Sequence, residues 1–206
     1  VPAVLEAWFS GSEAGNALAD VVFGAVNPSG KLPFTFPVRL EDNGAHALGE
    51  YPGADKVKYN ESIFVGYRWH DKEQLKPLFA FGHGLSYTAF AVGNVKADRT
   101  TLAPNGSIRI SADVTNTGDR AGAEVVQLYI GDEQSSLPRP VKELKGFQKV
   151  SLNPGQTRTV TFEITPGMLQ YYDDAKGAWV AEPGAFTAYV GAASDDIRGT
   201  VEFELK

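Results

Sequence analysis

The charged side chains that could contact a ligand are few and lie in the first third of the chain. Glu13 follows an apolar segment that we expect to be a strand and precedes one that we expect to be a helix. Loops at that edge of an open α/β sheet commonly face ligands, which makes Glu13 a candidate binding residue. The alternative is a carboxylate that serves the N-terminus of the helix, where the helix dipole favours negative charge.

Glu61 and Arg68 form a second pair of candidates. Glu61 lies at the end of a long polar segment, 38–62, and Arg68 lies in an aromatic-rich segment, 63–69, that we expect to be a strand. Long loops without secondary structure are uncommon and often functional, so this pair is a candidate for the wall of a ligand site or of a domain interface. The alternative is a structural Glu–Arg ion pair that holds the strand in place.

Metal and cofactor chemistry leaves no recognisable pattern in the chain. His46, His70 and His83 are scattered, and none has a second histidine or a carboxylate at metal-ligand spacing. The chain has no cysteine, which removes disulfides and thiolate metal sites. We therefore expect no metal and no cofactor, and we interpret the histidines as ordinary loop or interface residues.

The charge balance limits the partners of the chain. The formal net charge of −6 argues against nucleic acid, because phosphate binding needs a basic face. No apolar run reaches the roughly 18 residues of a membrane-spanning helix, so we expect no membrane partner. The absence of cysteine fits a secreted or periplasmic bacterial protein as well as a cytosolic one.

The elements that position the candidate residues begin with a strand–loop–helix pattern. Residues 3–9 are apolar, like a short buried strand, and Ser12 is a plausible N-cap. Apolar residues over 14–23 then repeat at helical spacing. Prolines in 27–37 exclude a helix and a central strand, so this segment is expected to be an extended strap.

From about residue 91 the apolar pattern changes to a period of two, which is typical of strands with one buried face. The alternation is clearest in 107–114, and turn signals rich in Gly, Pro, Asn and Asp separate the apolar runs. The pattern predicts an antiparallel β-sandwich of about seven strands. Further strands are expected at 125–130, 144–150, 157–164, 184–190 and 200–205.

The fold class is therefore mostly β, with a β-sandwich over 91–206 preceded by the tail of an α/β domain over 1–40 and a linker over 41–90. The chain opens abruptly on an apolar segment, so we expect it to be the end of a larger protein. Without that protein's remaining parts, the following apolar residues should be exposed: Val4, Leu5, Trp8 and Phe9.

Motifs in the first part of the chain resemble a known family. The segments 8–15 (WFSGSEAG), 19–24 (ADVVFG) and 27–33 (NPSGKLP) resemble the end of the second domain of glycoside hydrolase family 3. This chain has Phe9-Ser10 where the family usually has Tyr-Pro, and Ala14 where the family usually has Gly.

Motifs in the rest of the chain extend the resemblance in the same order. The segments 64–68 (FVGYR) and 81–88 (FGHGLSYT) look like the family's link into its third domain. The segments 114–118 (VTNTG), 124–129 (EVVQLY) and 140–147 (PVKELKGF) resemble the family's fibronectin type III-like domain. The resemblance spans essentially the whole chain.

This resemblance implies the carboxy-terminal part of a retaining β-glycosidase, most often a β-glucosidase that hydrolyses β-linked glucosides. Such enzymes use two carboxyl groups roughly 5 Å apart. In the family the nucleophile is an Asp in an N-terminal barrel, and the acid/base is a Glu in the second domain, ahead of the part seen here. No position of this chain matches either motif, so we assign no catalytic residue, and we expect the chain alone to be inactive.

The resemblance also names the expected partners. These are the N-terminal barrel and the rest of the α/β domain, in the same or a companion chain, and a β-glucoside or oligosaccharide substrate. Glu13, Glu61 and Arg68 then become candidates for the substrate rim. The alternative function is a non-catalytic carbohydrate-binding or structural β-sandwich module, which an exposed row of aromatic residues would favour.

Two aromatic groups bear on that alternative. Tyr171, Tyr172 and Trp179 could form a platform that stacks on sugar rings, although aromatic residues of a sandwich more often lie in the core or at an interface. A second group is expected to pack between the two domains: Phe64, Tyr67 and Trp69.

Overall fold

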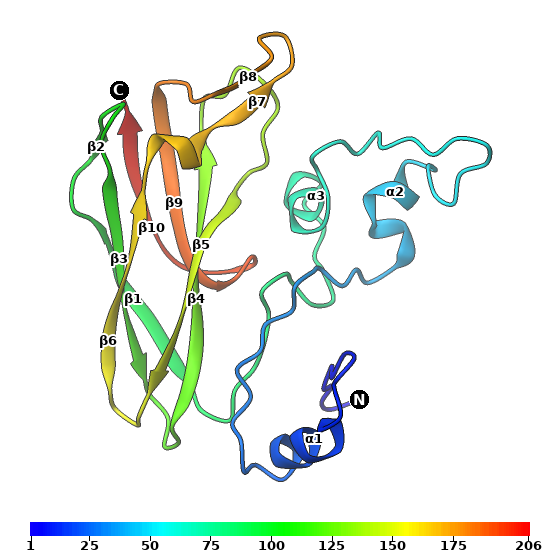
Figure 1. Cartoon of the computed structure of the whole chain (residues 1–206), viewed down its shortest axis with the longest axis vertical. Helices are drawn as coiled ribbons and strands as arrows, with labels where there is room; N and C mark the ends of the chain where they lie inside the picture. Colours follow the sequence, from blue (N-terminus) through cyan, green and yellow to red (C-terminus); the bar gives the residue numbers. More distant parts are fainter.

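The computed structural model describes the whole chain, residues 1–206. It shows a β-sandwich with a largely irregular N-terminal part along one side (Figure 1). One sheet has three strands in the order β1-β3-β6, and the other has five in the order β2-β10-β9-β4-β5. A separate hairpin, β7-β8, completes the set. The strands are β1 (Phe90–Ala97), β2 (Thr101–Leu102), β3 (Ile108–Asn116), β4 (Gly122–Asp132), β5 (Glu143–Leu152), β6 (Thr157–Ile164), β7 (Tyr171–Asp173), β8 (Ala178–Val180), β9 (Gly184–Ala193) and β10 (Asp196–Leu205).

The sandwich follows from the period-two pattern. In β3 the alternating side chains are buried, and β6 pairs with it in antiparallel register, so both contribute one apolar face to the core. All pairings between long strands are antiparallel, and only the two-residue β2 runs parallel to its neighbour β10. A single cluster of 19 buried apolar residues fills the space between the sheets. The expected antiparallel β-sandwich is confirmed.

The N-terminal part contains short helices joined by extended chain. The expected helix over 14–23 is confirmed as α1, but Glu13 and not Ser12 takes the N-cap position. The strap 27–37 is extended, and Phe36 forms a β-bridge with Phe79. No helix of the structure is both long and apolar enough to cross a bilayer. The helices are α1 (Ala14–Val22), η1 (Leu40–Asp42), α2 (Gly44–Ala47), α3 (Tyr67–Lys72) and, inside the sandwich, η2 (Pro166–Leu169).

Two of the expected strands are wrong. Residues 3–9 form no strand and are exposed, because no neighbouring strand is present to pair with them. Residues 63–69 lead instead into helix α3. Gly66, with φ of +59°, ends the extended chain. The backbone N–H of His70 then donates to the Gly66 carbonyl at 3.2 Å, which closes the first helical turn.

Polar side chains join the N-terminal part to the sandwich. The Asn27 amide oxygen accepts hydrogen bonds from the Ser86 hydroxyl (2.9 Å) and the Tyr87 N–H (2.8 Å), and its Nδ2 donates to the Ala121 carbonyl (3.0 Å). Lys31 contacts Glu124 at 2.7 Å. The two parts are therefore held by specific polar contacts as well as by packing.

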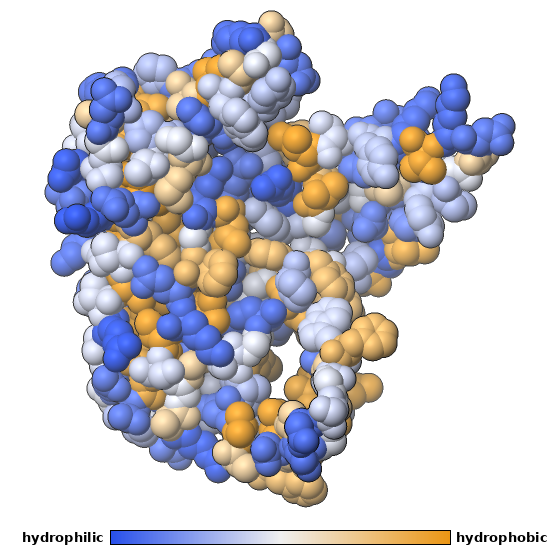
Figure 2. Space-filling view, in the orientation of Figure 1, coloured by the Kyte–Doolittle hydropathy of each residue, from blue (hydrophilic) through white to orange (hydrophobic).

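The N-terminal part exposes many large apolar side chains, as expected for its first residues. Figure 2 shows apolar side chains along this part of the molecule, and also between polar side chains on the visible face of the sandwich. A solvent-exposed apolar surface of this kind commonly marks contact with another protein surface. The exposed residues near the start are Val1, Val4, Leu5, Trp8, Phe9, Leu18, Val22 and Phe23.

Candidate functional site

Helix α3 carries the side chains that connect the N-terminal part to the five-stranded sheet. Tyr67 is buried, and its hydroxyl accepts a hydrogen bond from the backbone N–H of Leu144 at 2.9 Å. Its ring lies 5.7 Å from that of Tyr129 in an edge-on arrangement and 5.0 Å from that of Phe81. The structure thus confirms that Tyr67 packs between the two parts of the chain.

Arg68 pairs with Glu143 and not with Glu61. The guanidinium of Arg68 lies 3.4 Å from the Glu143 carboxylate, on strand β5 of the sandwich. The expected alternative of a structural Glu61–Arg68 pair is therefore wrong. Because α3 replaces the expected strand, the direction of the Arg68 side chain is set by the helix and leads it to the sheet.

Glu143 is the centre of a partly buried ion cluster. Besides Arg68 it contacts Arg139 at 2.5 Å and Lys145 at 3.4 Å. Burial acts to raise the pKa of Glu143, but the hydrogen bond from Arg139 and the three positive charges outweigh it, so the pKa is lowered. Burial also lowers the pKa of Lys145. Glu143 is therefore a charged structural anchor.

A second carboxylate shares Arg139 but does not form an acid/base pair with Glu143. Asp132 lies 3.5 Å from Arg139, and burial raises its pKa. A glycosidase pair needs an open space between its carboxyl groups for the glycosidic oxygen. Here the guanidinium bridges the two carboxylates, whose side chains are only 6% and 15% exposed. The arrangement supports the sandwich, and it offers no access to a substrate.

Asp71 and Lys142 form another ion pair between α3 and the sandwich. Their charged atoms are 2.6 Å apart, and the side chains are 21% and 9% exposed. At this degree of burial, loss of one partner leaves the other charge without compensation. Together with Arg68 and Tyr67, the pair gives α3 several independent attachments to the five-stranded sheet.

Glu61 is buried, and an oxygen of its carboxylate lacks a hydrogen-bond partner. Its Oε2 has no hydrogen-bond partner, and the same is true of Nε1 of the neighbouring Trp69. A Cβ on Gly44 would lie 3.0 Å from the Trp69 ring and 3.3 Å from the Glu61 Cβ, so a larger residue there would require these neighbours to shift by a few tenths of an ångström. The fold therefore holds the Glu61 carboxylate against α2 and α3 with one oxygen unused.

Glu13 lies far from the other two candidates, at the end of the molecule where α1 is found (Figure 1). It is exposed, and its carboxylate accepts a hydrogen bond from the Asn16 side chain at 2.6 Å. It makes no side-chain bond to a backbone N–H of the helix. The structure thus brings Glu61 and Arg68 into one region, through α3, and leaves Glu13 outside it.

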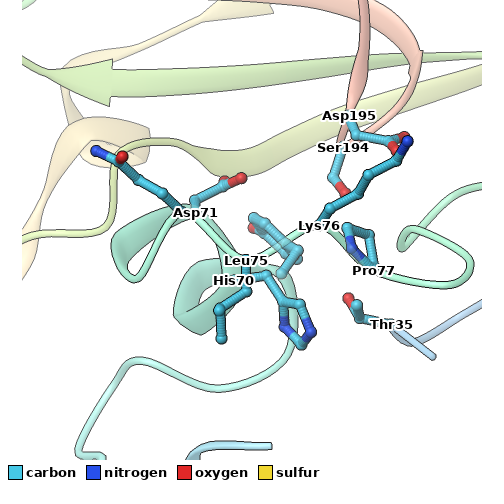
Figure 3. Close-up of a pocket in the computed structure, with 10 residues that line it drawn as sticks. Thr35, His70, Asp71, Leu75, Lys76, Pro77, Ser194 and Asp195 are labelled. Atoms are coloured by element: carbon cyan, nitrogen blue, oxygen red, sulfur yellow. The ribbon is translucent and has the colours of Figure 1, made fainter. Parts of the chain in front are cut away.

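A hollow of about 420 Å³ opens beside α3 (Figure 3). His70 and Thr35 form one wall, while Ser194 and Asp195, from the turn between β9 and β10, lie across from them. Nδ1 of His70 lies 3.0 Å from the Gly66 carbonyl, which can only accept, so this nitrogen carries the proton. His70 Nε2 and the Thr35 hydroxyl have no partner.

The structure contains no group of three His, Cys, Asp or Glu side chains that could hold a metal ion. Its three histidines lie apart: His70 faces the hollow, His83 stacks on Phe79 with ring centres 5.6 Å apart, and His46 lies 4.9 Å from the Tyr51 ring.

The sequence patterns described above do not predict the ion cluster of the sandwich. Glu143, Lys142 and Lys145 stand in the segment 140–147, whose family resemblance says nothing of how its charges pair. The alternating charges in that segment were a usable signal, since charges on a half-buried strand need partners. Their partners on α3 could not be found by spacing, because about 70 residues separate them in the sequence.

Comparison with known families matches both parts of the chain. Residues 1–87 match the glycosyl hydrolase family 3 C-terminal domain, and residues 124–194 match the fibronectin type III-like domain. The fold and its polar attachments thus define a class: a fibronectin type III-like sandwich bound to the end of an enzyme domain.

Relatives match the chain over almost its whole length. Beta-glucosidase BoGH3A of Bacteroides ovatus is 53% identical over 99% of this chain and 28% of its own length. Thermostable beta-glucosidase B of Acetivibrio thermocellus is 48% identical over 96% of this chain and 26% of its own length. The chain therefore belongs to glycoside hydrolase family 3, and it spans about a quarter of the length of these relatives.

Solved structures agree with this assignment. A GH3 beta-glucosidase of Bifidobacterium adolescentis superposes with a TM-score of 0.90 at 38% identity, covering 97% of this chain and 29% of that one. A beta-glucosidase of Kluyveromyces marxianus in complex with glucose gives a TM-score of 0.85 at 43% identity, covering 94% of this chain and 23% of that one. The chain corresponds to the carboxy-terminal part of such enzymes.

The Asp71–Lys142 pair gives a first prediction. Replacing Asp71 by Asn is expected to lower the free energy of unfolding by about 3 kcal/mol, because the Lys142 charge stays buried without its partner. Urea denaturation measures the change. The control is Glu73→Gln, which removes the exposed Lys72–Glu73 pair (45% and 40% exposed) and should cost at most about 1 kcal/mol. Equal losses in the two variants would contradict the prediction.

The Glu143 cluster gives a prediction about pH. Since the pKa of Glu143 is lowered from 4.5 in the folded state, its carboxylate stabilises the fold above that pH, and the contribution is lost as the pH falls through the folded-state pKa. The Tm difference between the unaltered protein and Glu143→Gln should therefore be largest near neutral pH and shrink below pH 4.5. The exposed Glu202→Gln serves as control, and a Tm difference for Glu143→Gln that stays constant with pH would disprove the assignment.

Proposed function

We propose that this chain works as the carboxy-terminal part of a retaining β-glucosidase that hydrolyses β-linked glucosides. The observation that carries the proposal is its 53% identity to a β-glucosidase over 99% of the chain. Retention of configuration is the part that comes from the family resemblance. The nucleophile Asp and the acid/base Glu lie upstream, in the N-terminal barrel and the earlier part of the α/β domain.

The role of this chain in the enzyme is to brace the other domains and to contribute to the substrate rim. The apolar surface of residues 1–23 supports contact with upstream domains, because large side chains such as Trp8 and Phe9 are exposed. The non-catalytic binding or structural module is the weaker alternative. A free-standing sandwich would not need residues 1–87, which match a glycosidase domain.

Glu61 is the strongest of the three rim candidates. Its Oε2 has no partner and is enclosed, so it becomes an acceptor for the substrate or an upstream domain only where the loop around it opens, and this loop leads into helix α3. Arg68 is then a positioning residue, because its pairing with Glu143 ties that helix to the sandwich. Glu13 is exposed beside the apolar surface of α1, where it could contact an upstream domain.

The proposed activity predicts the stereochemistry of the reaction. The complete enzyme should release β-glucose first from an aryl β-glucoside, because two displacements at the anomeric carbon restore its configuration. Proton NMR of the early products measures this. The 206-residue chain alone should show no turnover, since both catalytic carboxyl groups are proposed to lie outside it. Initial release of α-glucose, or turnover by the isolated chain, would overturn the corresponding part of the proposal.

The rim assignment of Glu61 has its own test in the complete enzyme. Glu61→Gln is expected to lower kcat/KM for an aryl β-glucoside about tenfold, the size of one lost hydrogen bond to a charged group, with little change in Tm. Glu41→Gln, an exposed carboxylate of the same linker, is the matched control and should leave both unchanged. Unchanged kcat and KM with an altered Tm would show that Glu61 is purely structural.

A further inference from the structure

The hairpin β7-β8 carries two exposed aromatic side chains side by side. Tyr172 and Trp179 are directly opposite in the strand register, with ring centres 5.6 Å apart and ring planes inclined at 71°, an edge-on arrangement. They are 50% and 65% exposed. The hairpin stands out at the opposite end of the molecule from α1 (Figure 1). Two large rings thus face solvent on one side of a short ribbon.

The other side of the hairpin is firmly anchored. Tyr171 is buried, and the Arg139 guanidinium lies 5.2 Å from its ring centre. The Tyr171 hydroxyl lies 3.1 Å from the Ser136 hydroxyl. In the turn, the buried Asp173 accepts hydrogen bonds from the backbone N–H groups of Ala175 (3.0 Å) and Lys176 (3.2 Å). The exposed rings are therefore held by a fixed backbone, which lowers the entropy cost of binding a ligand.

Polar side chains stand at both ends of the aromatic pair. Gln170 has an extended backbone, so the alternation of side chains puts it on the same side as Tyr172. Asp174 is exposed and begins the turn at the other end of that strand. An amide and a carboxylate both bond hydroxyl groups well. The surface thus combines aromatic faces with hydrogen-bonding groups along its edges.

The size of the aromatic surface selects a small ligand over a protein. Aromatic side chains have about 150–250 Å² each, so the exposed portions of Tyr172 and Trp179 offer roughly 200 Å² together. A stable protein interface takes about 800 Å² from each partner. One or two pyranose rings fit the smaller area. Because the two ring planes are inclined at 71°, the C–H face of a pyranose stacks on one ring and contacts the other at its side, with the sugar hydroxyl groups directed to polar neighbours.

We propose that Tyr172 and Trp179 form a binding site for β-linked glucosyl chains, with Gln170 and Asp174 as hydrogen-bonding groups at its edges. The choice of a glucosyl chain rests on the proposed function, because a β-glucosidase meets such chains as substrates. The site increases the time that the enzyme spends on a soluble or surface-bound glucan.

The test uses the complete enzyme and native gels that contain barley β-glucan. The glucan should retard migration of the unaltered enzyme. Trp179→Ala and Tyr172→Ala should each reduce this retardation, which corresponds to an apparent Kd for the glucan raised at least tenfold. Phe147→Ala is the matched control, because Phe147 is a 67%-exposed aromatic residue of the sandwich outside the hairpin. It should behave like the unaltered enzyme. Equal Tm values show that all variants are folded.

Turnover of an aryl β-glucoside, measured on the same samples, separates this inference from the proposed function. It should be unchanged in every variant. Intact turnover without retardation of the unaltered enzyme, or with equal retardation of Trp179→Ala, overturns the glucan site and leaves the proposed function standing. Absence of turnover in the unaltered enzyme counts against the proposed function instead. A change of oligomeric state in Trp179→Ala would show that a second copy covers the rings, and this too overturns the glucan site.

Discussion

The buried amide of Gln127 is the interaction on which the arrangement of the two parts depends. It lies within β4, inside the five-stranded sheet, where an unpaired amide would be costly. Its Nε2 donates to the carbonyls of Gly82 (3.1 Å) and Ala192 (2.6 Å), and its oxygen accepts from the Tyr129 hydroxyl at 2.5 Å. Burial raises the pKa of Tyr129, which keeps that hydroxyl a donor. The sandwich therefore needs the linker to satisfy its own core, and Gly82 must be glycine, because a Cβ there would lie 2.2 Å from the Gln127 oxygen.

The sequence predicts those elements whose stability is local or whose partners are regular. The strands of the sandwich are recognisable because each buries one face, and the alternation in 107–114 alone identifies that face. Helix α1 is recognisable from its apolar spacing. The strand expected at 3–9 does not form, because an apolar pattern does not say whether a neighbouring strand is present to pair with it. The strand expected at 63–69 is replaced by a helix, because the positive φ of Gly66 and contacts with the sheet outweigh the preference of aromatic residues for strands.

The candidate site was predictable only in part, for a related reason. Glu61 and Arg68 were found as charges beside a long loop, but their partners were not. Arg68 meets Glu143, which is 75 positions later in the sequence, and Asp71 meets Lys142 at a similar separation. Spacing rules find ion pairs within one helix or across a known register. They cannot find a pair that forms only when a helix packs on a sheet.

Hydrogen bonding divides the molecule in the same way as the fold does. Buried polar side chains of native proteins are nearly always paired. Within the sandwich only the Ser135 hydroxyl is buried without a partner, whereas the other such atoms belong to Thr35, His46, Glu61, Trp69 and His70. The sandwich thus pairs nearly all of its buried polar groups, and it pairs several of them with the N-terminal part: Gln127 with Gly82, Lys142 with Asp71, and the Leu144 N–H with Tyr67. The segment from the strap to α3 is attached to the sheet by its ion pairs. Within this segment, several buried polar atoms have no hydrogen-bond partner. Under the proposed function, the upstream domains pack on the exposed apolar side chains of this part, so the position of Glu61 is determined jointly by the sandwich and by the part of the enzyme that carries out the chemistry.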